Sequence, residues 1–200
     1  MPAPDLRAPE LPAPEAPPSR ARTPAMPTRL KPLAETPRPI DAGARIGHVH
    51  LKVADLDRAL GFYCGVLGFE VMQRLSSGAA FISAGGYHHH IGLNTWDSKG
   101  GHPPSPGTTG LFHTAILYPT RPALADALHR VISAGIQLDG ASDHGVSEAL
   151  YLRDPDDNGV ELYWDRPKEM WPKREDGGLR MYTNPLDLRD LLAELDKAQG

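Results

Sequence analysis

The most constraining feature of this sequence is an order of secondary structure that occurs twice. The periodicity of apolar residues predicts, in turn, a strand over 46–53, a helix from Asp55, and short strands near 69–72, 79–82 and 90–93. After a loop at 98–110 the same order returns as a strand over 111–118, a helix over 121–134, and strands near 136–142, 146–153 and 159–164. Two copies are too few for a solenoid. We therefore expect an α+β fold in which two βαβββ modules, 46–97 and 111–164, pair into one open, cupped β-barrel.

The ends of both predicted helices carry ordinary capping signals. Asp55 can accept from free amides of the first turn, and apolar residues follow at helical spacing up to Gly68. The second helix has Leu124, Leu128 and Val131 on one face and stops at Gly135. Asp55 thus marks the start of the first helix, and Gly68 and Gly135 mark where the two helices end.

The segments outside the modules differ in composition from them. Residues 1–40 hold 12 of the 21 prolines and show neither helical nor strand periodicity, so we predict a disordered Pro-rich tail over 1–43. The folded domain should span 44–168. The remaining segment, 169–200, carries a leucine-rich stretch at 186–195, which predicts a short amphipathic helix that covers a sheet edge or joins a homo-oligomer.

Charge and cysteine content restrict the partners and the compartment. A net charge of −4 provides no broad positive field for nucleic acid or anionic lipid, so we expect small-molecule partners, no nucleic acid and no membrane. No apolar run is long enough to span a bilayer. A single cysteine, Cys64, can form neither an internal disulfide nor a multi-cysteine metal site. This composition predicts a cytoplasmic protein.

Three residues at related positions suggest a metal site. His48 lies near the start of the first strand of module one, His113 lies at the corresponding place in module two, 65 residues later, and Glu161 lies in the last strand. Two histidines and one carboxylate suit divalent iron or manganese, because they occupy one face of the ion and leave positions open for ligands. Each residue alone is more often a solvated or satisfied strand residue, and only pairing of the modules would bring the three together.

Two segments resemble the extradiol ring-cleaving dioxygenases, the catechol 2,3-dioxygenase group of the vicinal oxygen chelate superfamily. The first segment, 47–56, reads GHVHLKVADL and is followed by Phe62-Tyr63 and by LGF at 67–69. The second, 143–164, reads DHGVSEALYLRDPDDNGVELYW and is the more specific. The resemblance covers 46–165, about 60% of the chain.

The resemblance assigns the metal ligands residue by residue. The family's first ligand stands seven residues before the helix-opening aspartate, as His48 does before Asp55. The second ligand begins the second module, as His113 does, and the third follows a DPDGN-type turn, as Glu161 does. This chain has Asp157 where the family has glycine, a position that normally requires positive φ.

The resemblance also implies residues that handle protons and substrate. His90 matches the histidine that moves protons beside the dioxygen site, although the adjacent His88 and His89 leave the register open. His144 and Tyr151 match the residues that hydrogen-bond substrate oxygen. His50 shares a sheet face with His48, because residues i and i+2 point the same way, and we expect it to contact substrate or oxygen.

The function implied is Fe(II)-dependent cleavage of a catechol-type aromatic diol by O2, as in the catabolism of aromatic compounds, with Mn(II) as the alternative metal. Two other functions share the fold. A glyoxalase-like lyase or isomerase would usually have a carboxylate ligand in the last strand of module one, where this chain has the run 88–90 of histidines. A non-catalytic protein that binds an aromatic drug or metabolite would lack the triad, and fold alone does not exclude it.

Overall fold

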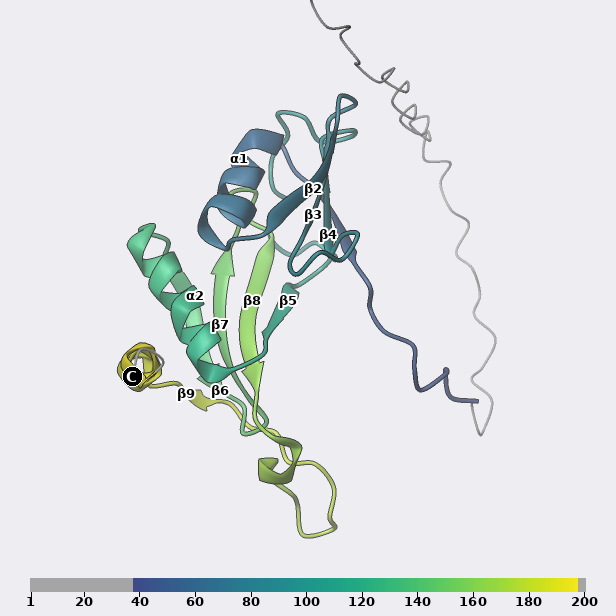
Figure 1. Ribbon diagram of the computed structural model, residues 1–200. Helices are drawn as coiled ribbons and strands as arrows, with labels where there is room; N and C mark the ends of the chain where they lie inside the picture. Colours follow the sequence, from purple (N-terminus) through teal and green to yellow (C-terminus); the bar gives the residue numbers. More distant parts are fainter. Residues whose placement is uncertain (1–37, 198–200) are drawn as a thin grey trace, which may run out of the picture.

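Each half of the chain forms one mixed β-sheet with a helix packed on it, in a computed structural model that describes residues 38–197 (Figure 1). The first half comprises β1 (Val49–Lys52), α1 (Leu56–Leu60), the π-helix η1 (Gly61–Val66), β2 (Glu70–Leu75), β3 (Ala79–Ser83) and β4 (Ile91–Asn94). The second half comprises β5 (Thr114–Tyr118), α2 (Arg121–Ser133), β6 (Leu138–Asp143), β7 (Ser147–Arg153) and β8 (Gly159–Asp165). The predicted βαβββ repeat is confirmed. Most of the predicted Pro-rich tail, residues 1–37, lies outside the described residues.

The two sheets share one topology. The first has the order β1-β4-β3-β2 and the second the order β5-β8-β7-β6, to which β9 (Asn184–Pro185) adds a fifth strand. In each sheet the first strand pairs in parallel with the last strand of its module, and the remaining module strands pair antiparallel. The predicted ligands His48 and His113 directly precede β1 and β5, which lie at sheet edges next to the last strand of the same module.

The first helix begins at the predicted cap Asp55, and the second begins at Thr120, a cap that was not predicted. The carboxylate of Asp55 accepts from the amide of Arg58 at 2.9 Å, and the hydroxyl of Thr120 accepts from the amide of Ala123 at 3.2 Å. Gly68 and Gly135 follow the helices with φ of 87° and 70°, in the left-handed region that favours glycine.

The first helix differs from the prediction in its second half. Instead of continuing as an α-helix to Leu67, it widens into the π-helix η1. The adjacent aromatic residues Phe62 and Tyr63 are both buried there, 5% and 0% exposed, whereas an α-helix turns neighbouring side chains about 100° apart. Both rings are buried in this π-helical turn, which the sequence periodicity alone did not predict.

One apolar core spans both modules. It contains Val53, Tyr63 and Leu93 from the first half and Leu128 and Leu162 from the second, each fully or almost fully buried. The helices α1 and α2 lie on the same side of the sheets, at the left in Figure 1, where they cover this core. Burial of apolar surface between the halves is the main force that joins them.

The turn between β7 and β8 joins the halves through hydrogen bonds. Asp154, 4% exposed, accepts from the Tyr63 hydroxyl at 3.0 Å and from the amides of Asp156 and Asn158 at 2.8 Å. Asp156 in turn accepts from the amide of Ala54 and forms an ion pair with Arg58. The DPDDN turn thus holds the start of the first helix.

Asp157 stands where the family has glycine, and it adopts the backbone conformation expected of that glycine. Its φ is 63°, and within residues 38–197 it is the only non-glycine residue with positive φ. Aspartate tolerates this region better than most side chains, because its short polar group can bond locally. The substitution therefore preserves the turn that leads into Glu161.

The C-terminal segment packs against the second half. Strand β9 pairs with β6, and the short helices α3 (Leu188–Leu192) and α4 (Glu194–Lys197) contact α2. Leu191 is fully buried in the common core. The predicted C-terminal helix is therefore present, divided into two short pieces. Among the described residues, none of the helices is both long and apolar enough to cross a bilayer.

We predict that the Asp154 turn contributes to stability beyond its own strands. Asp154→Ala leaves the Tyr63 hydroxyl and two turn amides without their buried acceptor and should lower the free energy of unfolding by about 3 kcal/mol. Tyr63→Phe, the matched variant, removes one donor while Asp154 keeps its others, and should cost about 1 kcal/mol. Urea denaturation of both variants measures these values. Equal costs would show that the carboxylate serves only Tyr63.

Candidate active site

Four polar side chains of the second half form one connected group. Nε2 of His113 lies 2.8 Å from Oε2 of Glu161, and the Tyr151 hydroxyl lies 3.2 Å from Oε1 of the same carboxylate. The Tyr151 hydroxyl also lies 2.7 Å from Nε2 of His144. The structure therefore brings together four of the residues that the sequence singled out, from β7, β8 and the segments that precede β5 and β7.

Strand register explains most of this grouping. Tyr151 and Glu161 are direct partners in the antiparallel pair of β7 and β8, so both side chains point to the same face. His113 directly precedes β5, which runs parallel to β8 and pairs Thr114 with Val160. His144 lies in the tight connection between β6 and β7, where its amide donates to the carbonyl of Ser147 at 2.9 Å.

A glycine lets His113 approach the sheet. A Cβ atom added to Gly159 would lie 2.0 Å from the carbonyl oxygen of Phe112 and 3.1 Å from Cα of His113. Only a residue without a side chain permits this approach. Gly159 therefore sets the distance between the His113 backbone and strand β8, which carries Glu161.

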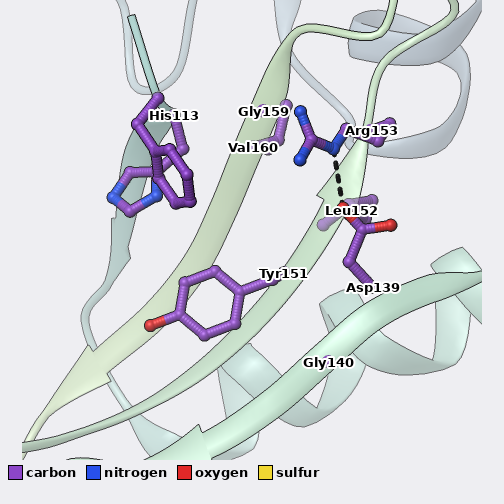
Figure 2. A pocket seen from close by; sticks show the side chains of 9 residues that line it. His113, Asp139, Gly140, Tyr151, Leu152, Arg153, Gly159 and Val160 are labelled. Atoms are coloured by element: carbon purple, nitrogen blue, oxygen red, sulfur yellow. Dashed lines mark hydrogen bonds and ion pairs between the residues drawn. The ribbon is translucent and has the colours of Figure 1, made fainter. Parts of the chain in front are cut away.

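An open pocket of about 280 Å³ adjoins this group. Figure 2 shows His113 and Tyr151 at this pocket, together with the ion pair in which Nε of Arg153 lies 2.6 Å from Asp139. The remaining lining is mainly apolar and includes Phe112, Leu152 and Val160. Phe112 is 80% exposed, and its ring centroid lies 5.5 Å from that of His113. An apolar pocket of this size, with a few polar groups at one place, is suited to a small ring-shaped molecule.

The environment of Tyr151 keeps its phenol protonated. Burial, the charge of Glu161 and the hydrogen bond to Glu161 together raise the pKa of Tyr151 to about 12. Near neutral pH the phenol is thus a hydrogen-bond donor with a single proton. Both His144 and Glu161 lie within reach of it.

Two of the three predicted metal ligands are in contact. An imidazole and a carboxylate side by side are donors that suit a divalent metal such as iron, and Nδ1 of His113 is buried without a hydrogen-bond partner. Among the described residues, however, no three His, Cys, Asp or Glu side chains are gathered as a metal-ligand set. His48 belongs to a different group of side chains, so its role as the third ligand stays a prediction.

His48 lies among the aromatic and histidine side chains of the first module. Its ring centroid is 4.4 Å from that of His89, and His89 also contacts Phe81 at 5.0 Å. His50 lies on β1 opposite Gly92, where a Cβ atom would come within 2.9 Å of the His50 ring. Burial and the neighbouring His48 lower the pKa of His50. The contact with substrate or oxygen expected for His50 stays a prediction.

The histidines of the run 88–90 have different neighbours. Nδ1 of His90 lies 3.0 Å from the hydroxyl of Ser83, and its ring packs on Tyr87. His89, rather than His90, contacts His48. The proton-handling role predicted for His90 is therefore untested, and His89 is the member of the run nearest to a predicted ligand by these contacts.

Three features of the site were not predicted from the sequence. The Arg153–Asp139 pair at the pocket comes from two strands whose register includes a bulge. The carbonyl of Tyr182, 2.9 Å from Nδ1 of His144, comes from 38 residues further along the chain. Phe112 alone was within reach of sequence reasoning, because it directly precedes a candidate ligand.

Comparison with known proteins gives a family and a set of relatives. A family described as the Glyoxalase/Bleomycin resistance protein/Dioxygenase superfamily matches residues 45–162. A protein of Bacillus subtilis (strain 168) named catechol-2,3-dioxygenase is 41% identical over 155 residues, which cover 78% of this chain and 53% of the relative. A biphenyl-2,3-diol 1,2-dioxygenase 3 of Rhodococcus globerulus is 35% identical over 60% of this chain and 63% of its own length. The chain thus spans between half and two thirds of the length of these relatives.

Solved structures share the fold. A glyoxylase/bleomycin resistance protein/dioxygenase domain from Frankia sp. EAN1pec has a TM-score of 0.54 at 23% identity, over 62% of this chain and 94% of the other. A glyoxalase/dioxygenase from Nostoc punctiforme has a TM-score of 0.51 at 18% identity, over 66% of this chain and 100% of the other. At these identities the likeness concerns the fold alone.

We predict that Gly159→Ala damages the site more than the matched change Gly140→Ala. The added methyl at Gly159 must displace the Phe112–His113 backbone, which should cost about 1–3 kcal/mol and separate His113 from Glu161. A Cβ at Gly140, which also lines the pocket, meets nothing within 4 Å. Thermal unfolding and iron titration of both variants provide the comparison. Equal iron affinity in the two would show that Gly159 does not set the ligand spacing.

Proposed function

Because the chain belongs to the Glyoxalase/Bleomycin resistance protein/Dioxygenase superfamily, we propose that it is an extradiol dioxygenase that cleaves a catechol-type aromatic diol with O2. The two relatives described above are named for dioxygenases that act on aromatic diols, and the first shares 41% identity over most of this chain. Family and fold alone do not decide chemistry. The proposal therefore depends on the side chains of the candidate site.

The observation that carries the proposal is the connected group of His113, Glu161, Tyr151 and His144 beside an apolar pocket. A diol that reacts with dioxygen requires donors for its two oxygens and groups that accept and return protons. The phenol of Tyr151 and the imidazole of His144 are such groups. The exposed ring of Phe112 offers an apolar surface that an aromatic substrate would cover.

In this proposal His48, His113 and Glu161 hold one Fe(II), with Mn(II) as the alternative. Divalent iron bound there would supply the redox chemistry by which dioxygen reacts with an aromatic ring. Tyr151 carries a phenol, which is protonated near neutral pH, and it donates this proton as a hydrogen bond to a substrate oxygen. His144 supports the phenol through Nε2, and the apolar walls of the pocket limit access of water.

A glyoxalase-like reaction is less well supported by the first module. That chemistry usually adds a carboxylate ligand from the last strand of this module. Strand β4 reads IGLN, and three histidines precede it. We therefore favour a site that keeps open positions for both diol and dioxygen.

The proposed activity is testable on the full chain. Protein reconstituted with Fe(II) without air, then mixed with catechol, substituted catechols or biphenyl-2,3-diol in air, should consume O2 and form a yellow ring-fission product. The metal-free chain is the control. Absence of both O2 consumption and yellow product with every diol in iron-loaded protein would contradict the proposal.

The ligand assignment predicts that His48→Ala, His113→Ala and Glu161→Ala each lose stoichiometric iron. The fold should survive, because the three side chains lie outside the buried apolar core. His129→Ala is the matched control, since His129 lies exposed on α2. Metal analysis and circular dichroism decide the matter. A variant of the first three that keeps one iron per chain would remove that residue from the ligand set.

The histidine that moves protons should be revealed by His89→Asn and His90→Asn. Both variants should retain iron, and loss of a general acid or base should lower kcat by about 10²–10⁴-fold. The contact of His89 with His48 leads us to expect the larger loss at His89. A loss confined to His90 would support the assignment by motif instead. Unchanged kcat in both variants would exclude either residue from proton transfer.

A further inference from the structure

The C-terminal segment reaches the candidate site through the residues that precede β9. We call residues 180–185 the C-terminal strap. At its start the Arg180 amide donates to the carbonyl of Pro172 at 2.9 Å, and at its end β9 pairs with the last residues of β6. Between these points the strap crosses the β6–β7 connection that carries His144. The Tyr182 amide donates there to the carbonyl of His144 at 3.3 Å.

The strap also binds the side chain of His144. Nδ1 of His144 lies 2.9 Å from the carbonyl oxygen of Tyr182 and 3.3 Å from the hydroxyl of Thr183. The other ring nitrogen, Nε2, faces the Tyr151 hydroxyl at 2.7 Å. The imidazole is thus held between the strap on one side and the candidate site on the other.

Close packing leaves little freedom in this arrangement. Gly145, next to His144, has φ of 78°, and a Cβ atom there would lie 2.6 Å from the Tyr182 ring and 2.8 Å from Pro172. The ring of Tyr182 therefore packs directly on the turn. A side chain at position 145 would force the strap away from His144.

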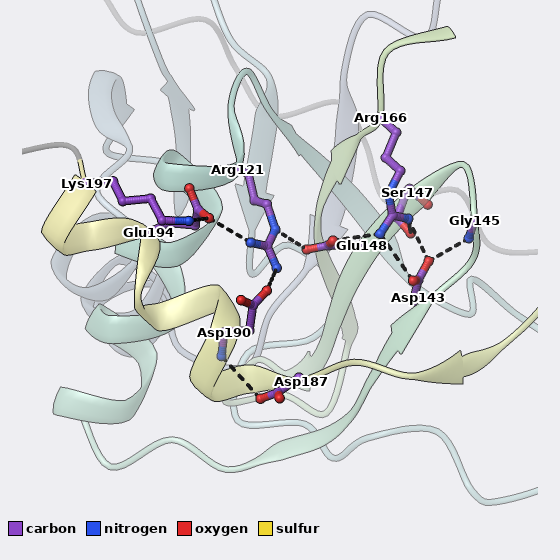
Figure 3. Close-up of polar contacts among 10 residues, drawn as sticks. All are labelled: Arg121, Asp143, Gly145, Ser147, Glu148, Arg166, Asp187, Asp190, Glu194 and Lys197. Atoms are coloured by element: carbon purple, nitrogen blue, oxygen red, sulfur yellow. Dashed lines mark hydrogen bonds and ion pairs between the residues drawn. The ribbon is translucent and has the colours of Figure 1, made fainter. Parts of the chain in front are cut away.

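A network of ion pairs anchors the same turn from its other side (Figure 3). Asp143 pairs with Arg166 at 2.6 Å and accepts from the Gly145 amide at 2.7 Å. Burial favours the neutral acid, but the Arg166 and Gly145 hydrogen bonds outweigh it and hold the pKa of Asp143 below its usual value. Arg166 also pairs with the buried Glu148, which pairs with Arg121.

The network continues into the C-terminal helices. Arg121 contacts Asp190 of α3 at 2.7 Å and Glu194 of α4 at 2.9 Å. The turn that carries His144 and the segment that follows the strap are therefore tied to one buried carboxylate, Glu148.

The chemistry of a carbonyl oxygen determines which nitrogen carries the proton. A backbone carbonyl can only accept a hydrogen bond, so the short contact to Tyr182 requires a proton on Nδ1 of His144. With Nδ1 protonated, the hydroxyl of Thr183 can serve as a second acceptor. A free neutral imidazole side chain in water prefers the opposite form, with its proton on Nε2.

We propose that the C-terminal strap, through the Tyr182 carbonyl, fixes His144 in the Nδ1–H tautomer, so that Nε2 alone gains and loses a proton toward Tyr151. Tyr182 is a positioning residue that acts through His144. This inference deepens the proposed function and rests on it, since it assigns the direction in which a proton travels within that site.

The consequence follows from the single proton of the phenol. When His144 is neutral, the single phenol proton can serve Nε2 or Oε1 of Glu161 but not both, and while it serves Nε2 it is withheld from Glu161 and from a substrate oxygen. When substrate gives up a proton, the Tyr151 oxygen accepts it as the phenol passes its own proton to Nε2. Nε2–H then donates to the Tyr151 oxygen, and the new phenol proton points toward Glu161 or the substrate oxygen. In both states Nδ1–H stays bonded to Tyr182, so no proton leaves toward the strap.

The test reads the imidazole directly. In the metal-free full chain with 15N-labelled histidine, long-range 1H–15N correlation spectra above pH 8 distinguish the protonated from the unprotonated ring nitrogen, and His144→Gln identifies the signals. We expect His144 to carry its proton on Nδ1. Tyr182→Ala removes the ring that packs on Gly145 and should shift His144 toward the Nε2–H form. Tyr182→Phe keeps the ring and should leave the tautomer unchanged.

Two results would overturn the proposal. An Nε2–H tautomer in the wild-type chain would mean that Thr183 donates to Nδ1 and that the strap does not set the proton. An unchanged tautomer in Tyr182→Ala would show that His144 needs no strap. The spectra report the tautomer in metal-free protein without turnover. Their outcome is therefore independent of whether the chain has dioxygenase activity. In the active enzyme, Tyr182→Ala should lower kcat about 10-fold or more with little change in KM, while Tyr182→Phe should not.

Discussion

The relative placement of the two halves of this molecule depends on the hydrogen bonds of the buried Asp154 carboxylate. It satisfies two amides of its own turn and the hydroxyl of Tyr63, a residue of the other half of the chain. A buried charge is tolerated only when its hydrogen bonds are complete, so the turn and the first helix must form together. The strand that leaves this turn carries Glu161. The same hydrogen bonds therefore join the modules and position the start of the strand that carries the candidate ligand Glu161.

Repetition of one module explains why the candidate residues lie where they do. In each sheet the first strand pairs in parallel with the last, which brings the segment before an edge strand close to a central strand. In the second module this geometry places His113 against Glu161. In the first module the equivalent place holds His48 with His89 and His50. The two modules thus have similar positions at this place, but different residue types occupy them.

The sequence predicted the parts of this structure that depend on local patterns. The cap at Asp55, the order of strands and the group of His113, Tyr151 and Glu161 follow from periodicity or from a motif with fixed spacing. Contacts between distant segments were beyond it. The π-helix accompanies the burial of two adjacent aromatic rings, and the register of the run 88–90 depends on how an irregular segment enters β4. Neither has a signature in one sequence.

The strap illustrates a general difficulty in assigning function from residue identity. The group that orients His144 is a main-chain oxygen, which every amino acid possesses. A relative with any residue at position 182 that packs on the glycine turn could present the same acceptor. If the backbone moved and this contact were lost, the residue types of the site would not reveal it. Searches restricted to residue types would pass over such a position, whereas backbone geometry would retain it. Divergence of C-terminal segments among relatives is therefore a route by which proton transfer can change while every side chain of the site stays the same.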